Sequence, residues 1–150
     1  MKITICGSIA FYDEMQKTKE LLEQIGHQVK LPPAEVPDEN GNLISVSEYY
    51  KIRKEQVHGN DSWVWKNKKI AIKNHFKKID WADAILVLNH KKNNITGYVG
   101  ANTLMEMGLA LYLDKTIYLL NDVPELSYKE ELLGIKPIII GNDLNKIFIT

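Results

Sequence analysis

The chain has 150 residues, of which 45% are hydrophobic and 25% are charged, a composition typical of a folded globular domain. Nineteen basic residues balance nineteen acidic ones, which argues against a dedicated binder of DNA or RNA, since such proteins are usually basic. No apolar run approaches the roughly 20 residues of a membrane helix, and a single cysteine excludes an internal disulfide and a cysteine-based zinc site. We expect one cytoplasmic domain over residues 1–150.

The first part of the chain predicts a strand, a helix and a second strand. Residues 2–6 are short, apolar and β-branched, which is typical of a buried strand rather than of a signal peptide, and Gly7 ends the run. Residues 14–25 carry an apolar stripe at helical spacing, and residues 27–31 form a second strand that two prolines stop. Together they have the size of a βαβ unit.

The middle of the chain is more polar. Residues 32–47 contain three prolines and show little periodicity, so we expect a long loop. Residues 46–80 are mostly helical in pattern and are broken at residues 59–61, where Asp61 or Ser62 is expected to cap a second helix. One face of that helix carries Lys66, Lys69, Lys73 and Lys77. The zero net charge favours a solvated face over a phosphate or nucleic-acid site.

The second half of the chain again alternates strands and helices. The expected elements are a strand at 84–88, a helix at 104–113, a strand at 116–120, a short helix at 125–133 and a last strand at 137–140. Pro124 is expected to open the short helix.

Five apolar strands alternating with helices predict an α/β fold. We expect a flavodoxin- or Rossmann-like, doubly wound, five-stranded parallel sheet with the strand order 2-1-3-4-5. In such sheets ligands bind beyond the carboxyl ends of the strands. Residues 7–12, 89–98 and 100–106 should therefore share a cleft.

The turn after the first strand is the first candidate ligand contact. Gly7 lets a ligand approach the backbone, Ser8 adds a hydroxyl, and free amides there bind a phosphate or a sugar hydroxyl. Ile9 and Phe11 belong to the same turn, and Asn89 ends the middle strand at the same edge of the sheet. The turn has neither the Walker nor the dinucleotide glycine pattern, and a plain tight turn is an equal alternative.

Glu106 is the most informative residue of the chain. It lies among apolar residues near the start of a predicted helix, where an unpaired buried charge would be costly. One interpretation is a structural role at the helix start, with Asn102 or Thr103 as the cap. The other is a carboxylate aimed into the cleft as a nucleophile or base, with Gly100, Asn102 and Thr103 in contact with the substrate.

Three segments, in order along the chain, resemble the nucleoside 2-deoxyribosyltransferase superfamily, which includes deoxynucleoside 5'-monophosphate N-glycosidases. Residues 5–9 (ICGSI) resemble its first strand and turn, and residues 82–87 (ADAILV) its middle strand. Residues 106–110 (EMGLA), followed by 114–117 (DKTI), resemble its nucleophile helix and next strand. The resemblance implies the same fold, a nucleoside or nucleoside monophosphate as substrate, no cofactor and no metal.

The resemblance also implies a mechanism. Glu106 would attack the anomeric carbon of the sugar, the base would depart, and water or a second base would resolve the glycosyl-enzyme. His75 aligns with an aspartate that many members carry, and it could act as an acid on the departing base. Asp83 is a further catalytic candidate, with a surface carboxylate at a helix end as the alternative. Gly100 stands where members often have Asp or Ser.

Two other functions stay open beside an N-glycosidase or deoxyribosyltransferase. The same fold could hold a nucleotide as a sensor without turnover. A cytokinin-type phosphoribohydrolase is the third possibility, but residues 97–106 retain its Thr-x-x-Glu and lack its Pro-Gly-Gly run. The resemblance further implies a homodimer or larger homo-oligomer, and large aromatic residues in polar segments favour it: Tyr49, Tyr50, Trp63 and Trp65.

Overall fold

The computed structural model describes residues 1–57, 59 and 62–147. Its contacts divide the chain into two compact units, which are residues 1–31 with 78–150 and residues 32–77. The expectation of one domain over the whole chain stays a prediction. No helix in the described part of the chain is long and apolar enough to span a membrane.

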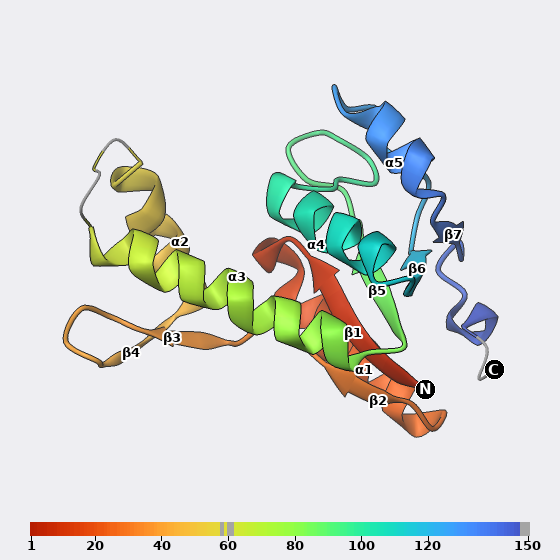
Figure 1. The fold of residues 1–150 in the computed structure, drawn as a ribbon, viewed down its shortest axis with the longest axis horizontal. Coiled ribbons are helices and arrows are strands. Elements are labelled where there is room, and N and C mark those ends of the chain that lie inside the picture. Colours follow the sequence, from red (N-terminus) through yellow and green to blue (C-terminus); the bar gives the residue numbers. More distant parts are fainter. Residues whose placement is uncertain (58, 60–61, 148–150) are drawn as a thin grey trace. The chain divides into compact units, whose positions relative to one another are not determined.

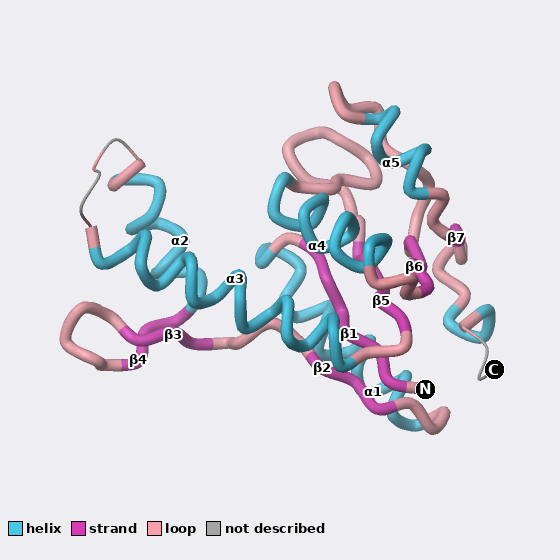
Figure 2. Tube along the Cα trace, viewed as in Figure 1, coloured by secondary structure: helices cyan, strands magenta, loops and turns pink. Residues whose placement is uncertain are grey.

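The first unit is a parallel sheet with flanking helices (Figures 1 and 2). Its strands are β1 (Lys2–Gly7), β2 (Gln28–Lys30), β5 (Ala84–Leu88), β6 (Thr116–Leu119) and β7 (Ile138–Ile139). Its helices are α1 (Tyr12–Gln24), α4 (Ala101–Tyr112) and α5 (Lys129–Ile135), with short 3-10 helices η1 (Ile9–Phe11) and η2 (Leu144–Lys146). The strand order is β2-β1-β5-β6-β7, and all neighbouring strands are parallel. The predicted fold class and order are confirmed, since these are the first to fifth strands of this sheet.

The centre of the sheet is formed by β1 and β5, whose apolar runs are buried on both faces. Because side chains alternate along a strand, Ile3 and Ile5 of β1 face the core that contains Met15 of α1. Cys6 lies on the opposite face, and α4 packs against β1, β5 and β6. The register pairs Cys6 with Val87, so the carboxyl ends of β1 and β5 are level.

The helix α5 begins later than predicted. The helix expected at 125–133 is present, but it begins at Lys129, so the expected start and the role of Pro124 as its opener are wrong. Pro124 is buried, and the Tyr128 hydroxyl donates a hydrogen bond to the Val99 carbonyl. These tertiary contacts hold the segment before Lys129 in a non-helical path.

The second unit contains a hairpin that was expected to be loop. The strands β3 (Glu35–Pro37) and β4 (Leu43–Ser45) pair antiparallel, so the prediction of a loop over residues 32–47 is wrong. The Asp38 carboxylate accepts hydrogen bonds from the backbone amides of Asn40 and Asn42, both at 2.8 Å, and closes the turn. Each strand has only three residues, too few to show an alternating pattern in the sequence.

Two helices complete this unit, α2 (Val46–Glu55) and α3 (Trp63–Trp81), the last four residues of α3 belonging to the first unit. Tyr49 and Val64 are buried together with Val36, and Trp63 and Trp65 pack against them. The unit therefore has an apolar cluster of its own, which includes three of the four aromatic residues that favoured a homo-oligomer in the sequence.

The structure tests two predictions for α3, the residue that caps its start and the solvated face of lysines. The Ser62 hydroxyl accepts a hydrogen bond from the Val64 amide at 3.2 Å and caps the helix. The alternative cap, Asp61, lies outside the described residues. The four lysines of the predicted solvated face are all exposed: Lys66, Lys69, Lys73 and Lys77.

Candidate functional site

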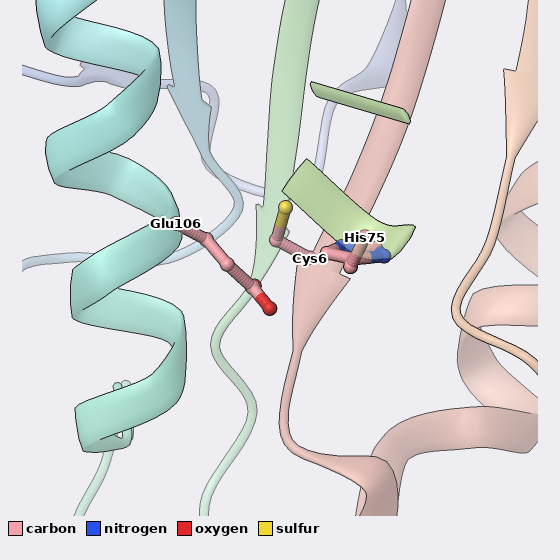
Figure 3. A group of neighbouring side chains, drawn as sticks. All are labelled: Cys6, His75 and Glu106. Atoms are coloured by element: carbon pink, nitrogen blue, oxygen red, sulfur yellow. The ribbon is translucent and has the colours of Figure 1, made fainter. Parts of the chain in front are cut away.

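A buried carboxylate lies beside the carboxyl end of β1, one of the two strands at the centre of the sheet. Glu106, the sixth residue of α4, is only 4% exposed. Its side chain extends from α4 toward β1, where Cys6 is the penultimate residue (Figure 3). A carboxylate oxygen of Glu106 and the Sγ of Cys6 lie within 4.8 Å of each other. The two groups are joined by a side-chain hydrogen bond.

A second donor reaches the same carboxylate from one helical turn earlier. The Asn102 Nδ2 donates a hydrogen bond to Glu106 Oε1 at 2.6 Å. Gly100 is the N-cap residue of α4, and no side chain caps the helix start. The interpretation of Asn102 or Thr103 as the cap is therefore wrong. Glu106 cannot form a capping box either, because that motif uses a glutamate at the third position of the helix and Glu106 is at the sixth.

The surroundings of Cys6 favour the neutral form of its thiol. Burial raises the pKa of the Cys6 thiol well above its ordinary value, and the negative charge of Glu106 and the hydrogen bond raise it further. The thiol therefore stays neutral and acts as a hydrogen-bond donor. The absence of a metal or cofactor from the function stays a prediction.

A lysine that the sequence analysis did not single out lies at the turn after β1. The Lys92 Nζ donates a hydrogen bond to Ser8 Oγ at 2.8 Å and lies 5.1 Å from the centre of the Tyr98 ring. Ser8 Oγ also accepts a bond from the Ala10 amide at 3.4 Å, which caps η1. A positive charge is thus held beside Ser8. In the sequence, the only indication of a role for Lys92 was that it lies within residues 89–98, which were predicted to line the cleft.

The other residues of this turn have structural contacts. Gly7 has a φ of +151°, and a Cβ there would lie 2.8 Å from the carbonyl oxygen of Leu88. Phe11 is buried in the core and packs edge-on against His90, with ring centres 5.3 Å apart. Ile9 is half-buried. Close packing of β1 on β5 accounts for the glycine, and the predicted ligand contacts of all three residues stay predictions.

Asn89 is fully buried, and its side chain joins two loops. Its Nδ2 donates to the carbonyls of Gly97, Asn121 and Asp122 at 3.1 to 3.3 Å, and its Oδ1 accepts from the Asn121 amide at 2.8 Å. These bonds occupy the polar atoms of the side chain. Its position does not support the predicted contact with a substrate.

Asp83 lies at the opposite edge of the sheet from Glu106. It directly precedes β5, and its Oδ2 accepts a hydrogen bond from the backbone amide of Lys2, the first residue of β1, at 2.7 Å. The length of β1 separates this edge from the Cys6 end by about 13 Å at roughly 3.3 Å per residue. The catalytic assignment of Asp83 is therefore wrong. Its carboxylate links the first residue of β1 to the residue before β5.

The remaining predicted residues are distributed over both units. Gly100 precedes α4 as its N-cap, and Thr103 is buried on α4. His75 is a buried residue of α3 in the second unit. The predicted roles of these three residues in binding and acid catalysis stay predictions.

Comparison with known proteins identifies the fold. A structure of a 2-deoxyribosyltransferase from Bacillus psychrosaccharolyticus matches 80% of this chain and 72% of its own, with 19% sequence identity and a TM-score of 0.50. A CMP N-glycosidase of Clostridium botulinum matches 93% of this chain and 83% of its own, with 17% identity and a TM-score of 0.45. No protein-family model matches the chain, and neither does any curated protein sequence. The first similarity shows that the chain has a fold of the 2-deoxyribosyltransferase kind.

Proposed function

We propose that this protein cleaves the N-glycosidic bond of a nucleoside or nucleoside monophosphate, with Glu106 as the nucleophile. The observation that carries the proposal is the placement of Glu106, a buried carboxylate beside the carboxyl end of β1. Asn102 and Cys6 bind it, and the helix does not use it as a cap. Ligands of parallel α/β sheets bind at this edge.

The fold and the sequence segments support the same reaction class. The chain shares its fold with an enzyme described as a 2-deoxyribosyltransferase. The segment that begins at Glu106 is one of three that resemble the corresponding superfamily. A carboxylate nucleophile suits sugar chemistry because the transition state is oxocarbenium-like and the covalent ester with the sugar breaks down readily.

The proposed reaction has two displacements. In the first, an oxygen of Glu106 bonds to the anomeric carbon, and the electron pair of the broken carbon–nitrogen bond stays with the base, which takes up a proton. In the second, the oxygen of water or the nitrogen of another base bonds to the same carbon, loses a proton and releases the Glu106 carboxylate. Water as acceptor makes the protein a hydrolase, and a second base makes it a transferase.

Two further residues complete the proposal. The resemblance makes His75 the candidate acid for the departing base, because histidine is the side chain most often used in general acid–base catalysis. Ser8, with Lys92 bonded to its hydroxyl, contacts the 5'-hydroxyl or 5'-phosphate of the substrate. An ammonium group beside a hydroxyl is a suitable partner for a phosphate.

The test is release of free base from a panel of nucleosides and nucleoside monophosphates, with ribose and with deoxyribose. We expect Glu106→Gln to reduce base release by at least ~10³-fold while binding is retained, because the covalent route is lost. Glu131→Gln, the same change at an exposed position of α5, is the matched control and should leave the rate unchanged. Wild-type turnover by Glu106→Gln would contradict the proposal.

One observation favours a second function, a nucleotide sensor without turnover. Glu106 is only 4% exposed, so a substrate must displace neighbouring groups before it reaches the carboxylate. Calorimetric titration of the same panel separates the two functions. Binding without base release by wild-type protein would favour the sensor.

A further inference from the structure

The proposed reaction leaves one buried group beside the nucleophile without a role, the thiol of Cys6. Cys6 is the single cysteine of the chain, is fully buried and forms no disulfide. We propose that Cys6 is a positioning residue, whose S–H donates a hydrogen bond to the Glu106 carboxylate and fixes the direction of the attacking oxygen. The proposal rests on the proposed role of Glu106 as the nucleophile.

Asn102 and Cys6 reach the Glu106 carboxylate from different elements, so the thiol supplies a constraint on its orientation that Asn102 does not. Asn102 lies on α4, as Glu106 does, so its bond fixes the carboxylate only relative to the helix. Cys6 lies on β1, within 4.8 Å of the carboxylate (Figure 3). Its bond fixes the carboxylate relative to the sheet edge, where a substrate would lie. The last torsion of a glutamate rotates over a broad range, and two donors in different places restrict it.

The chemistry of a thiol suits this role. Burial and the neighbouring carboxylate raise the pKa of Cys6, so the thiol keeps its proton and remains a donor at neutral pH. A thiol is a weak donor. It therefore orients the carboxylate while withdrawing less electron density from the attacking oxygen than a hydroxyl would.

Kinetics of three variants test the positioning role. Cys6→Val has a similar volume and no donor, so we expect kcat to fall about 10- to 100-fold with little change in KM, the effect of misorienting a reacting group. Cys6→Ser restores a donor and should recover kcat to at least about a third of the wild-type value, above that of Cys6→Val. Ile5→Val is the control on the same strand, with its side chain on the opposite face. It should lower the melting temperature by a few degrees at unchanged kcat.

Infrared spectroscopy tests the hydrogen bond independently of activity. Because the chain has one cysteine, the S–H stretching band reports on Cys6 alone. A bond to a charged acceptor weakens the S–H bond, so the band should lie at lower frequency in wild type than in Glu106→Gln, and highest in Glu106→Leu. Asn102→Ala removes the donor that α4 supplies and should leave the band at low frequency.

The outcomes separate this proposal from the proposed function. An S–H band at the same frequency in wild type and both Glu106 variants overturns the positioning role, whatever the activity. A shifted band with wild-type kcat in Cys6→Val also overturns it. The proposed function is overturned if Glu106→Gln releases base at the wild-type rate, or if the wild-type protein releases no base. Either result also overturns the positioning role, even when the S–H band shifts. A shifted band, a slow Cys6→Val and rescue by Cys6→Ser support the proposal.

Discussion

The backbone of Gly7 lies against the carbonyl of Leu88, at the point where β1 and β5 end together. A side chain there would approach that oxygen to 2.8 Å, and the φ of +151° disfavours any residue with a Cβ. We expect Gly7→Ala to lower the free energy of unfolding by about 2 kcal/mol or more, measured by urea denaturation. Gly108→Ala on α4 is the control, since its Cβ would meet nothing within 4 Å. It should stabilise the helix by up to about 1 kcal/mol, and an equal loss in both variants would contradict this account.

The Asn89 amide donates to three backbone carbonyls, so this position requires a donor. Asn89→Asp keeps the shape and places an oxygen against those carbonyls. We expect the free energy of unfolding to fall by roughly 2 kcal/mol or more, because the carbonyls lose their donor and a charge is buried. Asn74→Asp, at an exposed position, is the control. A similarly small effect for both changes would show that Asn89 is not a structural link.

The Cys6 thiol gives a predicted pH dependence of stability. Its pKa is raised in the folded protein, so the folded state binds the proton more tightly than the unfolded state does. The stability contributed by the neutral thiol is fully present below the ordinary cysteine pKa of about 8.5 and is lost as the pH rises through the folded pKa. The free energy of unfolding of the wild type should therefore decline more steeply above about pH 8.5 than that of Cys6→Val. Parallel curves for the two proteins would contradict the assignment.

At the scale of elements, a tyrosine hydroxyl links the end of the segment between β6 and α5 to the loop before α4. Tyr128 donates to the Val99 carbonyl, which links the start of α5 to the loop before α4. Tyr128→Phe removes that donor and should lower the free energy of unfolding by about 1 kcal/mol. Hydrogen exchange should become faster in the backbone amides next to residues 99 and 128. Tyr112→Phe, at a position 82% exposed, should change neither quantity.

The elements also show how far the sequence could predict this structure. The strand at 84–88 was predicted with its observed bounds because a central parallel strand is a continuous apolar run. The β3–β4 hairpin could not be predicted, since its turn depends on a single carboxylate, Asp38, and its strands are short. Glu106 was found through its apolar surroundings and the family resemblance. The contact of Cys6 with Glu106 could not be found, because it depends on how α4 packs on β1.

At the scale of the whole molecule, the homo-oligomer stays a prediction of the resemblance. The exposed face of α4 carries large apolar side chains, Met105, Leu111 and Tyr112, which are 47 to 82% exposed. An exposed apolar face of this kind is where we expect a subunit contact. We expect sedimentation at micromolar concentration to give a dimer or larger assembly, and Leu111→Glu to shift it toward the monomer. A monomeric wild type would contradict the prediction.

The central claim of this account is a covalent bond between Glu106 and the sugar. It is tested most directly by intact-protein and peptide mass spectrometry after reaction with a fluorinated nucleoside analogue whose glycosyl-enzyme hydrolyses slowly. The account predicts a mass increase of one glycosyl group on the wild type, located on Glu106 and missing from Glu106→Gln. Release of base with no adduct, or an adduct on another residue, would contradict it.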